Sequence, residues 1–174
     1  MQTLFECKIR FNKIDDRSGK EKRMTETYLF DAITYTEAEE RAYKEMQEYI
    51  SGEFNVSSIR KAKYAEIFPS DDGDRWYKVK VSFLSVDEAS GREKRVSQLV
   101  LVLASNIKDA CDKTIEGMNG VTDDFEINSV IESPIMDFFP LFDKDALPED
   151  REIARRPLEP NETISNTPQE TESE

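Results

Sequence analysis

The sequence predicts an α+β fold made of two tandem ββαβ repeats related by a pseudo-twofold axis, with a mainly antiparallel sheet and both helices packed on one side. The first observation behind this prediction is an internal match, because residues 5–46 align with residues 77–118 without a gap. The match resumes one residue shorter between residues 54–69 and 125–140. The second observation is that both copies show the same order of strand-like and helix-like periodicity. Two units sharing one core are expected, since a single unit of about 65 residues would have a thin core.

Each repeat begins with a predicted β-hairpin. Every second residue from Phe5 to Phe11 is apolar, which is typical of a half-buried strand. Gly19 lies in the following turn, where glycine readily adopts the positive φ that hairpin turns require. The second strand is expected at residues 24–32. Its equivalent at residues 96–104 is almost wholly apolar, which indicates a strand covered on both faces.

A helix and a third strand complete each repeat. Thr36 and Glu39 form a capping-box pattern at the start of the first helix, and Asn106 is the expected N-cap of the second. Apolar residues at helical spacing then predict one buried face on each helix. The third strands are expected at residues 54–68 and 125–139, with an interruption midway.

The chain is predicted to have one domain and an acidic tail. Residues 1–145 are the expected single domain, made of the repeats 3–69 and 75–140. Residues 146–174 are predicted to be disordered, because residues 141–174 hold ten acidic residues, four basic residues and four of the seven prolines. Such a tail is either a solubilising terminus or a segment that docks on a partner or competes for the protein's own binding site.

The residue types present exclude much catalytic chemistry. The chain has no histidine, so it has no Ser-His or Cys-His nucleophile pair and no imidazole metal site. Its two cysteines are too few for a zinc cluster and are expected to be buried thiols in a reducing compartment. No phosphate-binding glycine motif occurs. We therefore predict a protein that is not an enzyme and that holds no cofactor and no metal.

The sequence also predicts a cytoplasmic protein. No apolar run is long enough to span a membrane, so no membrane partner is expected. The N-terminal residues lack the basic and apolar regions of a secretion signal.

Basic residues gather at three places and suggest a nucleic-acid contact. The candidate contact residues are Lys20, Lys22 and Arg23 in the first hairpin, Arg92, Lys94 and Arg95 in the second, Arg60, Lys61 and Lys63 in the third strand, and the aromatic residues Trp76 and Tyr77. The residues Lys8, Arg10, Lys78 and Lys80 are expected on the polar faces of the first strands. Proteins that bind single strands combine a basic groove with aromatic rings on which bases stack. The pattern predicts association with single-stranded nucleic acid through the basic hairpins.

A second interpretation stays open, because carboxylates accompany the same basic residues and the net charge is −13. An acidic chain of this kind can act as an adaptor or inhibitor that engages a basic protein or mimics nucleic acid, without binding nucleic acid itself. Basic residues that share one face of the fold would favour nucleic-acid binding, and basic residues scattered among carboxylates would favour the adaptor or inhibitor. Leu141 and Phe142 have no counterpart in the first repeat and are candidates for a contact with a second copy of the chain.

The chain resembles a bacterial family that carries a domain of unknown function, found also in phages and mobile elements. The segments that carry the resemblance are FECKIRF, TEAEERAYKEM, ISGEF, YAEIF, GDRWYKVKVSFL, EKR and IMDFFP. It covers residues 4–140 and ends at the tail. The resemblance implies a link to phage or mobile-element genes. It implies no activity, cofactor or catalytic residue.

Overall fold

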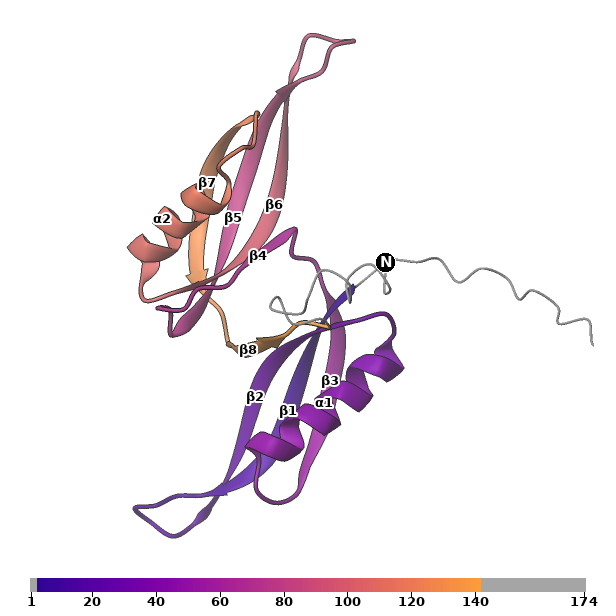
Figure 1. The fold of residues 1–174 in the computed structure, drawn as a ribbon, viewed down its shortest axis with the longest axis vertical. Coiled ribbons are helices and arrows are strands. Elements are labelled where there is room, and N and C mark those ends of the chain that lie inside the picture. Colours follow the sequence, from indigo (N-terminus) through magenta and orange to yellow (C-terminus); the bar gives the residue numbers. More distant parts are fainter. Residues whose placement is uncertain (1–2, 142–174) are drawn as a thin grey trace, which may run out of the picture. The chain divides into compact units, whose positions relative to one another are not determined.

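The computed structural model describes residues 3–141, so Phe142 and the predicted tail at residues 146–174 lie outside the described part of the chain. The first half consists of β1 (Thr3–Ile14), β2 (Glu21–Ala32), α1 (Tyr35–Tyr49), β3 (Phe54–Ala62) and β4 (Glu66–Phe68) (Figure 1). The second half consists of β5 (Arg75–Val86), β6 (Glu93–Ala104), α2 (Ile107–Gly117), β7 (Asp124–Glu132) and β8 (Ile135–Phe139). The α+β class predicted from the sequence is confirmed.

The strands form two sheets where the sequence predicted one. The first sheet has the strand order β3-β1-β2-β8 and the second the order β4-β6-β5-β7. Three strands of each sheet are antiparallel and come from one half of the chain. The fourth strand comes from the other half and is parallel to its neighbour, since β8 pairs with β2 and β4 pairs with β6. The predicted single sheet is therefore corrected to two mixed sheets that exchange their last strands.

The exchange follows from the break in each third strand. In the first half, β3 ends at Ala62 and the chain leaves the edge of its own sheet, where the backbone N–H of Ala65 donates to the carbonyl of Leu99 at 2.8 Å. In the second half, the N–H of Ser133 donates to the carbonyl of Trp76 at 2.7 Å, just before Pro134. Proline has no N–H to donate, so the β7 ladder cannot continue through it. The interruption predicted from the sequence is the point of crossing.

The two hairpins turn in the same way because they contain the same Asp-x-x-Ser-Gly pattern. The carboxylate Oδ1 of Asp15 accepts hydrogen bonds from the backbone N–H of Arg17 at 2.8 Å and of Ser18 at 2.9 Å. Gly19 then has a φ of 64°, a left-handed conformation that glycine adopts without a steric penalty. Asp87 and Gly91 repeat this arrangement in the second hairpin.

The helix starts lie at polar caps, one of them two residues earlier than predicted. The hydroxyl of Thr34 accepts from the N–H of Glu37 at 3.2 Å, and the carboxylate of Glu37 accepts from the N–H of Ile33 at 2.7 Å. This capping box replaces the predicted pair of Thr36 and Glu39, because the backbone of Thr34 is still in the extended conformation and the helix begins at the next residue. The predicted cap of α2 at Asn106 is confirmed.

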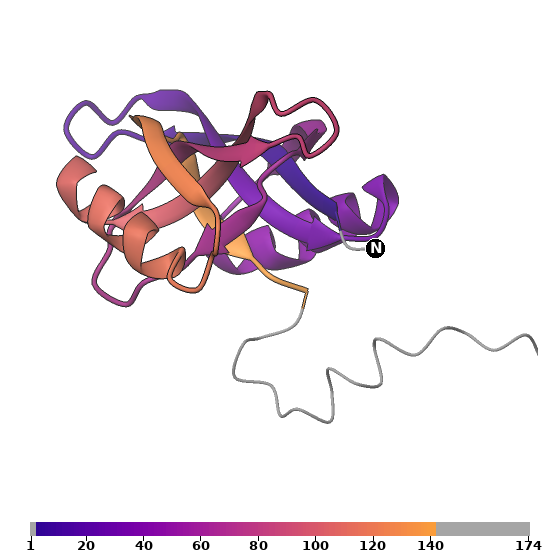
Figure 2. The same ribbon diagram turned by 90° about the horizontal axis from the view of Figure 1, so that it is seen from above.

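Each helix covers one face of its own sheet, and two cores result (Figures 1 and 2). In the first half, residues from β1 and β2 pack on α1, and the cluster of buried side chains comprises Phe5, Cys7, Ile9, Tyr28, Phe30, Ala32, Ala38, Ala42 and Met46. In the second half, β5 and β6 pack on α2 through Tyr77, Val79, Val81, Val100, Val102, Ala104, Ala110 and Met118. Burial raises the pKa of the Cys7 thiol to about 12, which agrees with its predicted role as an apolar core residue.

A third core joins the halves on the sheet faces that the helices leave uncovered. Its buried side chains are Leu29, Trp76, Leu101 and Ile135, from β2, β5, β6 and β8. Partly buried residues such as Tyr64 and Phe138 pack around them. This third core occupies only one end of each uncovered face, so the remaining part of each face stays open to solvent.

Candidate nucleic-acid interface

The open face of the first sheet is the side of β1, β2 and β3 opposite α1. Strand side chains alternate between the two faces, and the odd-numbered residues Phe5, Cys7 and Ile9 of β1 pack against α1. The even-numbered residues of β1 therefore lie on the open face. Cross-strand pairing places Arg23 opposite Asn12 and thus on the same face.

Four basic side chains on this face form what we call the basic strip: Lys8, Arg10, Arg23 and Arg60. All four are exposed. Their cross-strand neighbours are mostly uncharged, since Arg10 lies opposite Thr25 on β2 and Asn55 on β3. Within residues 3–141, no ion pair involves Lys8, Arg10 or Arg23. These three cations are thus available to an anion from outside the chain.

A shallow hollow lies at the outer end of the basic strip. Its polar lining includes Arg10, Asn12, Arg23 and Asn55, and Glu53 contributes one carboxylate at its rim. Guanidinium groups with amide neighbours offer several hydrogen-bond donors to a phosphate. The hollow therefore suits an anion better than a cation, although Glu53 reduces the local positive charge.

The inner end of the strip meets a buried carboxylate, Glu6, whose side chain is 7% exposed. One oxygen of Glu6 accepts from Arg60 Nε at 2.8 Å and Nη2 at 2.5 Å, and the other accepts from the Tyr64 hydroxyl at 3.1 Å. Lys78 Nζ of β5 lies 3.8 Å from the same carboxylate. Burial and the neighbouring Glu6 charge raise the pKa of Tyr64, so its hydroxyl stays a hydrogen-bond donor. One anion is here shared by two cations, which leaves a net positive charge at this end of the strip.

A family comparison places the chain among related sequences. The model of DUF4494, a domain of unknown function, matches residues 3–141. The chain belongs to this family. No curated protein matches the chain.

The second sheet of the DUF4494 domain carries a different open face. Arg10 and Arg60 have Ser82 and Ile131 at the equivalent positions. Ser82 is buried and shares hydrogen bonds with Ser97, at 2.8 Å, and with Asn128. Arg95 is paired with Glu126 at 3.0 Å. The strip of unpaired cations is therefore a property of the first sheet.

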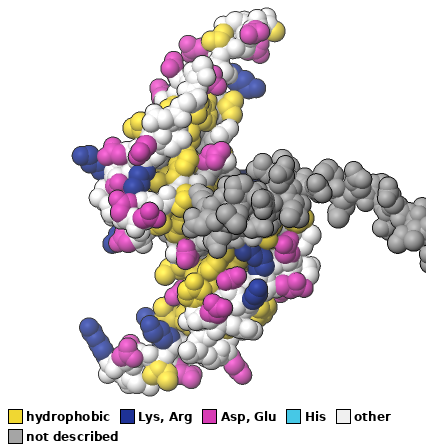
Figure 3. Space-filling model, in the orientation of Figure 1, with side chains coloured by type: hydrophobic (Ala, Val, Ile, Leu, Met, Phe, Trp, Pro, Cys, Tyr) yellow, Lys and Arg dark blue, Asp and Glu magenta, His cyan; other side chains and the backbone are white. Residues whose placement is uncertain are grey.

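The structure divides the site residues predicted from the sequence between two faces. Arg23, Arg60 and Arg95 lie on the open faces. Lys22, Lys61 and Lys94 lie on the helix sides, where Lys61 Nζ stands 5.7 Å from the centre of the Tyr35 ring. Lys20 and Arg92 lie in the hairpin turns and Lys63 in the crossing between β3 and β4. On the surface shown in Figure 3, basic side chains stand among acidic ones. The predicted residues thus do not make one continuous surface.

The two predicted aromatic contacts are corrected. Trp76 and Tyr77 are each only 3% exposed, so neither ring offers a surface for a base to stack on. They are consecutive residues of β5, and alternation sends Tyr77 into the second core and Trp76 into the third. Lys8 and Arg10, expected from the sequence on a polar strand face but not among the candidate contact residues, lie in the basic strip. Strand alternation was the signal that identified their side of the sheet.

The described part of the DUF4494 domain contains no helix long and apolar enough to cross a membrane. Nor do residues 3–141 bring together three or more Cys, Asp or Glu side chains that could hold a metal ion.

Proposed function

We propose that this DUF4494 domain is a non-enzymatic binding protein that associates with single-stranded nucleic acid through the basic strip of its first sheet. The observation that carries the proposal is the segregation of Lys8, Arg10 and Arg23 on one face, without a carboxylate partner among the described residues. Phosphate contacts from such residues supply affinity that does not depend on base sequence. The resemblance to a bacterial family that is also found in phages and mobile elements supports an accessory role.

A single strand fits this surface better than a duplex does. The chain as a whole is strongly acidic, so a rigid duplex held against the strip would also bring its phosphates near carboxylates. A flexible strand can follow the strip and avoid them. Because Trp76 and Tyr77 are buried, we expect binding by charge with little contribution from base stacking.

Fluorescence anisotropy of labelled single- and double-stranded oligonucleotides, titrated with the full chain across a salt series, tests the proposal. We expect weak binding to the single strand that decreases steeply with salt. Three or four phosphate contacts predict a slope of about −2 to −3 in a plot of log affinity against log salt.

The variant K8E/R10E should weaken this binding about tenfold or more, since two cations become anions at the centre of the strip. The matched control is K44E/K108E, which changes the net charge equally at exposed helix positions away from the strip. Equal losses in the two variants would show that only total charge matters and would contradict the assigned site.

The alternative of an acidic adaptor or inhibitor is supported by the scatter of the basic residues predicted from the sequence over both faces of the sheets. It predicts a different result in the same experiment. A protein that engages basic partners should bind neither oligonucleotide, even at low salt. That outcome would end the nucleic-acid proposal.

A further inference from the structure

A second surface lies on the opposite side of the first sheet, where the hairpin extends past the helix. Strands β1 and β2 have 12 residues each, and at about 3.3 Å per residue they span roughly 40 Å. Helix α1 has 15 residues and at about 1.5 Å per residue spans only about 22 Å. The helix therefore cannot cover the whole hairpin, and the uncovered part projects beyond its C-terminal end (Figure 1).

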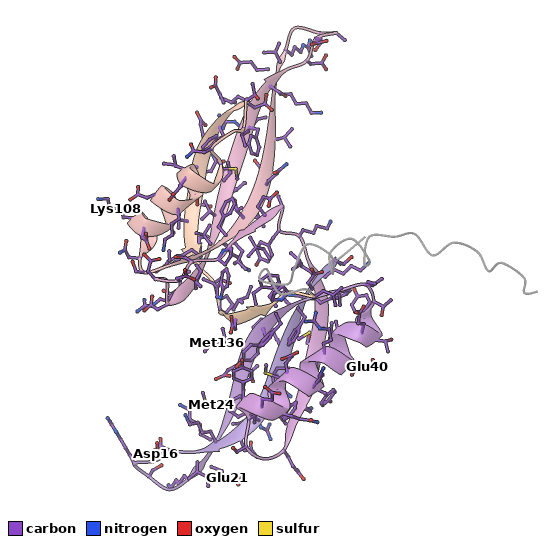
Figure 4. All side chains as sticks on the ribbon, viewed as in Figure 1. Asp16, Glu21, Met24, Glu40, Lys108 and Met136 are labelled. Atoms are coloured by element: carbon purple, nitrogen blue, oxygen red, sulfur yellow. The ribbon has the colours of Figure 1, made fainter. Side chains whose placement is uncertain are left out.

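A hollow, which we call the overhang hollow, lies where the hairpin projects beyond the C-terminal end of α1. Its apolar walls are Phe11 and Met24 from the strands and Tyr49 and Ile50 from the end of α1. Figure 4 shows Met24 near that end of the helix and Glu40 farther along it. Tyr49 is 62% exposed, so an aromatic ring at the mouth of the hollow remains accessible.

The overhang hollow is also strongly negative. Three carboxylates line it, from Glu21, Glu26 and Glu53, against a single cation, Lys13. The last turn of α1 has no basic residue, so the partial negative charge of the helix end is not compensated there. The Tyr28 hydroxyl donates to Glu26 Oε2 at 2.7 Å, and burial together with this carboxylate raises the pKa of Tyr28. The hollow therefore attracts cations and repels the phosphates that the basic strip would bind.

The second half of the chain lacks two of the groups that define this hollow. Gln98 stands at the position of Glu26, and Val100 at the position of Tyr28. The charged, hydroxyl-bearing pair is thus specific to the first hairpin, and E26Q reproduces the residue found in the second.

We propose that the overhang hollow binds a basic peptide segment of a partner protein, one in which an apolar side chain lies between lysine or arginine residues. The apolar side chain would enter between Met24 and Tyr49, and the flanking cations would pair with Glu21, Glu26 and Glu53. Aromatic walls also favour cations that lie over their rings. The overhang hollow adjoins the hollow of the basic strip, because Phe11, Asn12 and Glu53 line both. Glu26 and Tyr49 line the overhang hollow and not the hollow of the basic strip, so substitutions there distinguish peptide binding from the proposed nucleic-acid contact.

Fluorescence anisotropy with the full chain tests this proposal. The probe is a short labelled peptide in which lysine alternates with phenylalanine and serine. The first control peptide keeps every lysine but replaces each phenylalanine with serine, and the second replaces each lysine with glutamate. We expect measurable binding of the first peptide only.

Two variants locate the peptide. E26Q and Y49S should each weaken binding about fivefold to tenfold, which corresponds to roughly 1 kcal/mol or slightly more. The matched controls are E40Q, an exposed carboxylate of α1, and I107S, a 57% exposed apolar residue at the start of α2. Neither control should change the affinity by more than about twofold, which is within the usual range for surface substitutions. Circular dichroism of each variant verifies that the fold is retained.

Three outcomes would overturn the proposal. Equal affinity for the phenylalanine and serine peptides would show that the acidic protein attracts any basic peptide without using the hollow. Equal losses of peptide affinity in E26Q and E40Q would show the same. The third outcome comes from analytical ultracentrifugation. If the parent protein sediments as a dimer and Y49S sediments as a monomer, a second copy of the chain fills the hollow instead.

Discussion

At the scale of single residues, the most informative site is the pair Glu6 and Lys78. The two residues occupy equivalent positions in the matched halves of the chain, yet one is an anion and the other a cation. They meet at 3.8 Å beside the third core. Identical residues here would place like charges together in a poorly solvated place, which is strongly unfavourable. The difference between the two halves therefore favours contact of one half with the other.

Neutralising Glu6 should destabilise the fold. E6Q retains the size of the side chain but removes the charge that Arg60 and Lys78 share, and we expect the free energy of unfolding to fall by about 1–3 kcal/mol. Urea denaturation measures the change. The control E40Q, at an exposed carboxylate, should stay within about 0.5 kcal/mol of the parent protein. A loss in E6Q no larger than in E40Q would show that the buried network adds nothing to stability.

At the scale of elements, the caps decide where the helices begin. The sequence contains two threonines that could start α1, and both are followed three residues later by glutamate. Only Thr34 has the extended backbone of a cap, with φ −129° and ψ 164°. Thr36 is already inside the helix, where a β-branched residue is mildly unfavourable.

This assignment predicts opposite effects for two similar substitutions. T34A should lower the free energy of unfolding by about 1 kcal/mol, because the N–H of Glu37 loses its acceptor. T36A should leave it unchanged or raise it by about 0.5 kcal/mol, since alanine is the better helix former. Thermal denaturation of both variants gives the comparison, and a larger loss in T36A would restore the cap predicted from the sequence.

At the scale of the whole described domain, the exchanged strands join the two halves. Phe139 of β8 stacks on Phe30 of β2, with the ring centres 4.9 Å apart, although the two residues lie in different halves of the chain. Arg41 of α1 donates to the carbonyls of Asp31 and of Pro140, the latter at 2.9 Å. The first core is thus completed by the last residues of the second half.

We therefore expect the halves to unfold together. F139A should destabilise the domain by about 2 kcal/mol, because it removes a large, partly buried side chain that packs against the first core. In urea, the fluorescence of Trp76 in the third core and the circular dichroism of both sheets should follow one coincident transition, before and after the substitution. Two separated transitions would mean that each half is stable without the other's strand.

Local features of this domain were readable from the sequence by itself. The hairpin turns at Gly19 and Gly91, the alternation along β1 and β5 and the N-cap at Asn106 each depend on residues near one another in the chain. Such patterns reflect side-chain period and backbone preference, which are short-range. They were sufficient for the α+β class and for locating the basic residues on strands and turns.

Only the tertiary structure decided how these pieces combine. The strand break was expected, but the sheet that β4 and β8 join depends on a long-range pairing that no local pattern encodes. The burial of Trp76 and the pairing of Arg60 with Glu6 follow from that choice, as they depend on which strands meet. The basic strip required the register of β1 against β2 and β3, and the overhang hollow required the length of the hairpin to be set against the length of α1. Each is a relation between elements distant in the chain, so the sequence supplied the residues and the packing decided which of them share a surface.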